Sequence, residues 1–540
     1  RHPDGHLAPT PTGQANIAIK HWASVSRQPA TSPAAATLLL NAIPATCKLS
    51  DEDADALDNA TITVAEVKRA LKTIPSGRSP GLDRIPCEFY RWYPDVLLPL
   101  LSRLYSSLIS LNRLPNNFCI SVISFIAKSR PPSDNIADYR PISLLNSDYR
   151  ILSKILANRL RKPLASILPR IQTAFLPGRQ IGDSILTLQF VSALLPRSEE
   201  ETVWALFCDF MKAYDTVDRS FLFRVMSHVG IPDRFTTLCR LLLSPTFSCA
   251  KVNRALSAPH YFAAGVRQGC PIAPLLYLFI GLAIHSFLVA EGFEPDLQLS
   301  PTRSLKIFGA QYADDLTILL RSLARLPALL AAFNTIADAT GQRLNPRKSA
   351  ICPLGGVNVP AVLPAVVHGI PVTRTQKTLG VFFGDTTLDP RANRRLWNDR
   401  LAALTSRLDK IHSLSLSTFG RAFASSCYGA SRFLFHLEFA DPESFLQLVN
   451  NAQAQIHRLT SSNRSSTARG RAFGRFVQLP TYGPPALGGY GVIPIREHYL
   501  SRHAKWALSL ICHRPAPWLD LALFLISSLS YNRLTPIALF

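Results

Sequence analysis

The sequence lacks the cysteine patterns of disulfide frameworks and zinc sites. Its ten cysteines are scattered, none stands in a CxxC pair, and none has the spacing to histidine of a zinc knuckle. This excludes a small disulfide-stabilised domain and a zinc-knuckle module. The first residues carry no secretory signal pattern. We therefore expect reduced thiols and an intracellular protein.

Acidic residues are also scarce. The chain has 36 Asp and Glu against 58 Lys and Arg, so its formal net charge is +22, and the excess is spread along the sequence. A spread positive charge suits a long polyanion, most simply a nucleic acid, although an unrelated basic protein could have the same composition. Apolar residues make up 47% of the 540, which excludes a disordered chain and is enough for several domains.

Methionine occurs only twice, and residue 1 is Arg, so we expect the sequence to be part of a longer reading frame. Residues 1–60 are rich in Ala, Pro, Ser and Thr without a steady period, which predicts a linker or loosely ordered lead-in. Residues 273–290 form a long apolar run close to the length of a membrane-spanning helix. His285 within the run and Pro274 at its start also suit a helix buried in a protein core, which we favour.

Two adjacent carboxylates stand between apolar, β-prone segments. Asp314 and Asp315 are preceded by residues 304–311 and followed by residues 316–320, which predicts a β-hairpin with both acids at the turn. Two neighbouring buried carboxylates repel each other, so a positive group is expected nearby. A simple polar turn is the alternative.

A third acid ends another apolar run. Residues 203–209 predict a buried strand with Asp209 at its carboxyl end, although an acid there can also cap the next turn. If the three carboxylates converge on one face of a sheet, they could hold two divalent cations for phosphoryl transfer. Mg²⁺ prefers carboxylate oxygens and shares its shell with substrate phosphates.

Basic residues follow one side of a predicted helix. In residues 149–161, Arg150, Lys154 and Arg161 form a stripe opposite an apolar face. Such a helix can pack on a core and contact phosphates, although a merely solvated face has the same pattern.

Eight blocks in order resemble the reverse transcriptases of non-LTR (LINE-type) retrotransposons. The resemblance covers residues 63–384 and continues more weakly to the C-terminus. The blocks are SGRSPGLDRIPCEFY (76–90), DYRPISLLNSDYRILSKILANRL (138–160), QTAFLPGRQ (172–180), FCDFMKAYDTVDR (207–219), GVRQGCPIAPLLYLF (265–279), YADD (312–315), GQRLNPRKS (341–349) and TLGVFFG (378–384).

The resemblance implies an α+β right-hand polymerase with fingers, a palm built on an antiparallel sheet, and a helical thumb. It implies an RNA-directed DNA polymerase that extends a primer 3′-OH with dNTPs on an RNA template. Two Mg²⁺ ions are the implied cofactors, with Mn²⁺ as an alternative. The implied partners are the RNA template, a DNA primer or target and dNTPs, with no membrane. The implied locations are a cytoplasmic ribonucleoprotein and the nucleus.

The resemblance also assigns roles to individual residues. It implies that Asp209, Asp314 and Asp315 are the catalytic, metal-binding acids, with the carbonyl of Phe210 as a further metal ligand. Tyr214 would be the aromatic gate that excludes a 2′-OH. The other implied nucleotide or template contacts are Arg140, Arg150, Lys154, Arg179, Gln268, Gly269 and Lys348, and the implied primer-supporting strand contains Leu379, Gly380 and Val381.

The expected domains follow from these blocks. They are the lead-in (1–60), an N-terminal extension and fingers (61–200), a palm (201–385), a helical thumb (386–460) and a C-terminal helical and loop region (461–540). No nuclease domain is recognisable before or after the blocks. Two alternatives stay open: a decayed nucleic-acid-binding relic, and an RNA-dependent RNA polymerase, which shares the palm chemistry.

Overall fold

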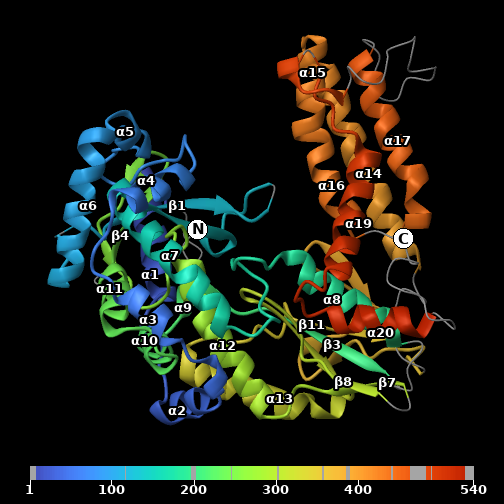
Figure 1. Cartoon of the computed structure of the whole chain (residues 1–540), viewed down its shortest axis with the longest axis horizontal. Coiled ribbons are helices and arrows are strands. Elements are labelled where there is room, and N and C mark those ends of the chain that lie inside the picture. Colours follow the sequence, from blue (N-terminus) through green and yellow to red (C-terminus); the bar gives the residue numbers. More distant parts are fainter. Residues whose placement is uncertain are drawn as a thin grey trace.

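The computed structural model describes residues 8–529 apart from residues 116, 130, 196–201, 245, 301–302, 356–357, 385–389, 440–441, 462–481 and 488. Two uprights rise from a common base (Figure 1). We call the mixed upright that contains β1 and α6 the first lobe, and the upright of helices α14–α17 the helical tower. The four-stranded sheet in the base is the central sheet. The mixture of helices and sheets confirms the α+β class.

The N-terminal residues are helical and packed, so the expected loosely ordered lead-in is wrong. Helices α1 (Pro11–Val25), α2 (Pro33–Asn41) and α3 (Asp51–Asp58) are capped by Thr10, Ser32 and Ser50, whose side chains accept backbone N–H groups. These helices contain many small residues, and α1 and α2 begin with proline. The spacing of their apolar residues therefore did not predict them. We call residues 11–32, which cross from the first lobe to the base, the N-terminal strap.

The first lobe packs helices on a sheet of order β2-β1-β4-β5, with β6 also paired to β4. Helix α4 starts at the predicted capping box, in which Thr63 and Glu66 exchange hydrogen bonds. The elements are α4 (Val64–Thr73), α5 (Cys87–Trp92), α6 (Pro94–Leu111), β1 (Ser121–Ala127), β2 (Tyr139–Leu145), α7 (Ser147–Ile167), α10 (Arg219–His228), α11 (Asp233–Leu243), β4 (Phe247–Val252), β5 (Ala255–Leu256) and β6 (His260–Tyr261).

The central sheet has the order β11-β3-β10-β9, and all its strands are antiparallel. Side chains of β3 alternate between two cores: Leu206 packs in the core that contains α12 and α13, and Phe207 in the core that contains α8 and α20. The elements are α8 (Ile181–Leu194), β3 (Val203–Cys208), α9 (Ala213–Thr216), α12 (Ala273–Ala290), β9 (Gly309–Tyr312), β10 (Asp315–Leu320), α13 (Leu326–Thr340) and β11 (Ala350–Gly355).

Helix α12 is the long apolar run of the sequence. Within the described residues it is the one helix long and apolar enough to cross a membrane, and 78% of it is buried inside the protein. Its neighbours are α7, α10 and α13, so the predicted core helix is confirmed. Its burial behind the central sheet makes it the support of that sheet.

Three two-stranded ribbons lie outside the larger sheets. In the third, Leu379 and Gly380 have positive φ and form the turn, so the strand predicted from Leu379 begins instead at Val381. The ribbons are β7 (Asp296–Ser300) with β8 (Arg303–Lys306), β12 (Val366–Val367) with β13 (Ile370–Pro371), and β14 (Thr375–Thr378) with β15 (Val381–Gly384).

The helical tower has its own core, in which Leu408, Leu437 and Val449 are fully buried. The predicted helical character of residues 390–460 is confirmed, whereas most of the loop expected at 461–475 lies outside the described residues. The helices are α14 (Pro390–His412), α15 (Thr418–Ala424), a π-helical turn (Ser425–Ala430), α16 (Ser431–Leu437), α17 (Pro442–Ser461), α19 (Ile495–Ile511) and α20 (Leu519–Leu529).

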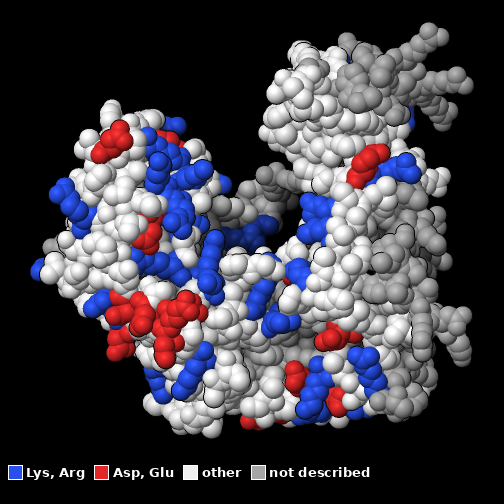
Figure 2. Space-filling model, in the orientation of Figure 1, with Lys and Arg blue, Asp and Glu red and all other residues white. Residues whose placement is uncertain are grey.

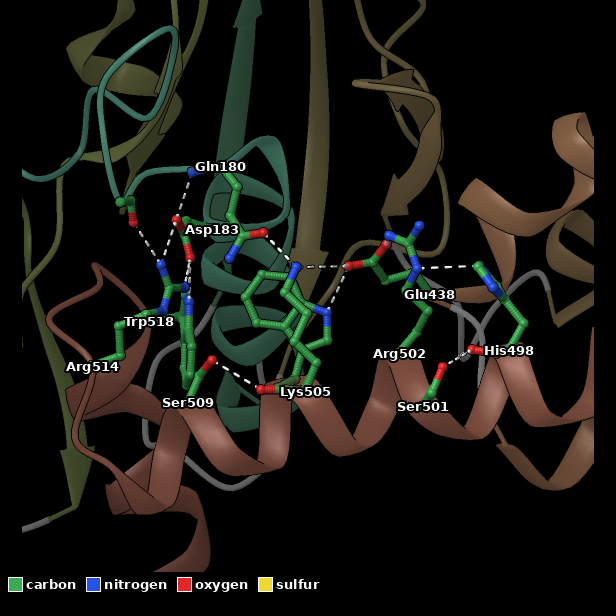
Figure 3. A network of polar contacts seen from close by, with 12 residues as sticks. Gln180, Asp183, Glu438, His498, Ser501, Arg502, Lys505, Ser509, Arg514 and Trp518 are labelled. Atoms are coloured by element: carbon green, nitrogen blue, oxygen red, sulfur yellow. Dashed lines mark hydrogen bonds and ion pairs between the residues drawn. The ribbon is translucent and has the colours of Figure 1, made fainter. Parts of the chain in front are cut away.

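Two acids fasten α19 and α20 to the rest of the chain (Figure 3). Asp183 of α8 pairs with Arg514 and accepts a hydrogen bond from Trp518 Nε1 at 2.9 Å. Glu438, at the end of α16, accepts hydrogen bonds from Arg502 at 2.6 Å and from Trp506 Nε1 at 3.0 Å. Because α19 carries the partners of Glu438 and the segment after it carries those of Asp183, this part of the chain joins the tower to the base.

Candidate active site

The strand register brings two of the predicted acids side by side. Leu316 of β10 pairs with Cys208 of β3, so Asp315 begins its strand opposite the end of β3, where Asp209 follows. The hairpin turn consists of Ala313 and Asp314, because Tyr312 and Asp315 still pair. The predicted strand, hairpin and acid positions are therefore all present.

A pocket of about 730 Å³ opens at this edge of the central sheet. Asp209 and Asp314 lie in its wall, together with Tyr214. The remaining lining residues come from the strap, the first lobe, the segment after β3, the 267–274 turn and the segment before β11; they are Trp22, Lys128, Ala137, Asp138, Tyr139, Arg140, Pro141, Phe210, Met211, Lys212, Ala213, Asp215, Arg267, Gln268, Gly269, Ala273, Pro274, Asn345 and Lys348.

The carboxylates of the site are held without a positive partner close by. Burial raises the pKa of Asp314, and the charge of Asp209 adds to the rise. Burial together with the charges of Asp314 and Asp209 raises the pKa of Asp315 to about 6, although its residue surface is largely exposed. The three acids therefore interact electrostatically.

Of the three acids, Asp315 is the exposed one and is not part of the pocket lining. No group of three or more His, Cys, Asp or Glu side chains in the described residues is arranged to hold a metal. The pair Asp209 and Asp314 remains, which with substrate phosphates and water could still complete an Mg²⁺ shell.

The segment that follows β3 is tied to the segment before β11. Asp209 donates its backbone N–H to Ser349 Oγ at 3.1 Å, and its carboxylate accepts a hydrogen bond from Asn345 Nδ2 at 3.2 Å. Phe210 forms an isolated antiparallel bridge with Leu344. These contacts fix the direction of the Asp209 side chain at the end of its strand.

Tyr214 is a partly buried side chain in the pocket wall. Its ring stacks on Tyr277 of α12 with the centroids 4.7 Å apart and the planes 13° apart. Its backbone carbonyl accepts the N–H of Val266 at 2.9 Å. Burial raises the pKa of the Tyr214 hydroxyl, and the nearby charge of Asp314 adds to the rise. Helix α12 therefore fixes the ring from behind.

The 265–269 turn closes the pocket on the side of the first lobe. The carbonyl of Gln268 accepts the N–H of Ser143 at 2.7 Å, and its side-chain amide donates to Asp215 Oδ2 at 2.8 Å. Gly269 has φ +113°, and a Cβ there would lie 2.6 Å from the carbonyl oxygen of Ser143. A side chain at position 269 would thus push the turn away from β2.

The predicted cations separate into three groups. Arg140 and Lys348 line the pocket, whereas Arg150 and Lys154 on α7 do not. Arg179 does not face a nucleotide: its guanidinium donates to the carbonyls of Pro169, Gln172, Ala165 and Leu168 at 2.5–2.8 Å. The proposed nucleotide contact by Arg179 is therefore wrong, because this side chain satisfies the free carbonyls at the C-terminus of α7.

Several lining residues were not predicted from the sequence, among them four polar ones. Lys128 follows strand β1, Lys212 lies between Asp209 and Tyr214, Asp215 follows the tyrosine, and Asn345 precedes β11. Lys212 lies within a recognised block and Lys128 outside the blocks, and both donate to the carbonyl of Ala137. The predicted primer-supporting residues Leu379, Gly380 and Val381 are not part of the pocket lining.

Comparisons with known proteins agree with this geometry. Residues 126–383 match the family model described as reverse transcriptase (RNA-dependent DNA polymerase). The chain is 29% identical over 321 residues to the transposon TX1 uncharacterized 149 kDa protein of Xenopus laevis, covering 59% of this chain and 24% of that protein.

Two further relatives match a similar share of this chain. The RNA-directed DNA polymerase from mobile element jockey of Drosophila melanogaster is 27% identical over 54% of this chain and 31% of its own length. The retrovirus-related Pol polyprotein from the type-1 retrotransposable element R2 of Popillia japonica is 26% identical over 56% of this chain and 44% of its own length. The chain thus spans less than half of these relatives. Its residues 126–383 are thus similar to the reverse transcriptases of non-LTR (LINE-type) retrotransposons.

Proposed function

We propose that the chain is an RNA-directed DNA polymerase that extends a primer 3′-OH with dNTPs on an RNA template. The observation that carries the proposal is the pair Asp209 and Asp314, which ends two adjacent antiparallel strands in the wall of a pocket rich in basic side chains. Acids beside cations are what nucleotidyl transfer requires, since it handles both metal ions and phosphates.

The architecture supports a right-hand assignment. The central sheet with α12 and α13 serves as the palm, the first lobe as the fingers and the helical tower as the thumb. A wide cleft lies between the lobe and the tower, and Lys and Arg side chains gather along its walls and floor (Figure 2). A duplex of template and primer fits a cleft of this charge. We extend the proposal to an RNA template, a DNA primer or target, and a cytoplasmic ribonucleoprotein that reaches the nucleus.

The residues present fit divalent cations. Asp209 and Asp314 are hard oxygen ligands, and the raised pKa of Asp314 reflects burial without a compensating positive charge. These two carboxylates would hold Mg²⁺, with the Phe210 carbonyl and Asp315 as further ligands. When bound, the ions supply activation of the primer hydroxyl and neutralisation of the leaving pyrophosphate.

The chain's own side chains orient the nucleotide. The Tyr214 ring, held against Tyr277, closes the space beside the sugar and would collide with a 2′-OH. Gln268 and Gly269 form the wall that borders the base and sugar. Four cations in the lining face the triphosphate, namely Lys128, Arg140, Lys212 and Lys348. Positioning by such contacts lowers the entropic part of the barrier.

Primer extension on an RNA template with dNTPs and Mg²⁺ tests the proposal. We expect Asp314→Ala to lower the rate by roughly 10³-fold or more, because the variant loses a preorganised group that stabilises charge in the transition state. The matched control is Asp296→Ala, which removes an acid of the β7–β8 ribbon outside the pocket. Full activity of the Asp314 variant would refute the site, and an inactive wild-type chain that still binds RNA would support a decayed relic.

A further inference from the structure

The N-terminal strap holds the first lobe and the base together. The carbonyl of Ser26 accepts the N–H groups of Ala263 and Ala264, both at 2.9 Å. Further along, Gln28 Nε2 donates to Asp218 Oδ2 at 2.5 Å, and Ser32 donates its backbone N–H to the carbonyl of Asp338 on α13 of the base at 2.6 Å. Helix α1 packs against the sheet of the first lobe through a small apolar core of its own. The strap is therefore fixed at both ends.

One strap side chain reaches the proposed nucleotide pocket. Trp22 is 1% exposed and lies in the pocket lining, although it precedes the matched family segment by about a hundred residues. The ammonium of Lys212 lies over its ring, 4.2 Å from the centroid. Trp22 is thus the contact between the N-terminal strap and the segment that carries the proposed gate.

Lys212 occupies a strained and crowded position. Its φ of +52° is unusual for a residue with a side chain. Its ammonium donates to the carbonyl of Ala137 at 2.8 Å, and the ammonium of Lys128 donates to the same oxygen at 3.1 Å. Lys348 lines the same pocket, so three ammonium groups share it with Asp215.

We propose that Trp22 is a positioning residue for nucleotide addition, whose ring holds the Lys212 ammonium toward the triphosphate of the incoming nucleotide. The inference rests on the proposed function. The negative face of the indole offsets part of the repulsion among the three lysines, because a cation over an aromatic face is stabilised. Without the ring, the flexible lysine side chain turns to solvent and leaves the triphosphate one contact short.

The test is steady-state primer extension with Trp22→Leu, which keeps an apolar side chain but removes the aromatic face. We expect the KM for dNTP to rise about 3- to 30-fold, the range of a partly desolvated cation–π contact, with kcat changed less than KM. Trp22→Phe should restore most of the affinity. In Lys212→Met the Trp22→Leu change should have no further effect on KM, because the pair acts as one unit.

Ile19→Ala is the matched control. Ile19 is fully buried in the same small core of α1 but does not line the pocket. Its loss should lower the melting temperature without changing the KM for dNTP. A Trp22→Leu variant with wild-type KM, an equal KM effect in Ile19→Ala, or additive effects of Trp22→Leu and Lys212→Met would each overturn the proposal while leaving the polymerase function standing. A wild-type chain that adds no nucleotide would overturn both.

Discussion

The carboxylate of Asp183 should control the attachment of α19 and α20 to the base. It is 2% exposed and accepts hydrogen bonds from Trp518 Nε1 and from the backbone N–H of Gln180, both at 2.9 Å, besides its ion pair with Arg514. Asp183→Asn removes the charge and turns one acceptor oxygen into a donor that faces another donor. Breaking a buried pair from one side costs about 3–5 kcal/mol.

The loss of stability should be confined to the C-terminal helices, because the partners of Asp183 lie between α19 and α20 or next to α8 (Figure 3). Amide hydrogen exchange of residues 495–529 measures the free energy of opening of this part directly. A loss of about 3 kcal/mol corresponds to roughly 150-fold faster exchange when the opening equilibrium sets the exchange rate. Exchange in α12, which has no contact with this network, should stay unchanged.

The chain offers a matched ion pair for comparison. Asp58 pairs with Arg234 at 3.2 Å, with side chains 45% and 42% exposed. Asp58→Asn should cost about 0–1 kcal/mol, because solvent screens an exposed pair. An Asp183→Asn variant whose C-terminal helices exchange no faster than those of Asp58→Asn would refute the reasoning.

Three further outcomes are expected. Tyr214→Ala should admit NTPs beside dNTPs in primer extension, and unchanged sugar selectivity would refute the gate. Mg²⁺ should raise the melting temperature of the wild type, and EDTA should reverse the rise; the rise should shrink in Asp314→Asn if this carboxylate holds the ion. Burial raises the pKa of Asp215 to about 7, so its ionisation cost is absent below about pH 4 and complete well above pH 7. Asp215→Asn should therefore gain stability relative to wild type as the pH rises from 5.5 to 8.5, by roughly 2 kcal/mol, and a pH-independent difference in unfolding free energy would contradict this.

Local rules allowed much of the fold to be predicted. The apolar run of residues 273–290, with Pro274 at its start, predicts the buried helix α12. The apolar strand before Asp209 and the hairpin at Asp314 are equally local patterns. Their meeting on one sheet was predicted because the order of the blocks resembles a known family.

The errors concern contacts between distant segments. Arg179 stands in a recognised block, but three of its four carbonyl partners, Ala165, Leu168 and Pro169, lie at or just after the end of α7, outside that block. Helix α1 of the N-terminal strap has little apolar period, and Trp22 contacts Lys212 across a sequence separation of 190 residues. Such pairings depend on tertiary packing, which local propensity does not encode.

The cost of ionising the buried groups of the proposed site is offset only when substrate is bound. Burial raises the pKa of Asp314 and lowers that of Lys212, so the protein disfavours the ionised form of both in the same pocket. If acid and lysine formed an ion pair, the shifts would run in the opposite directions. Lys128 and Lys212 instead donate to one backbone carbonyl, that of Ala137. Cations bound by the acids and a triphosphate bound by the lysines would offset both costs at once, so loading of the metal and of the nucleotide should each favour the other.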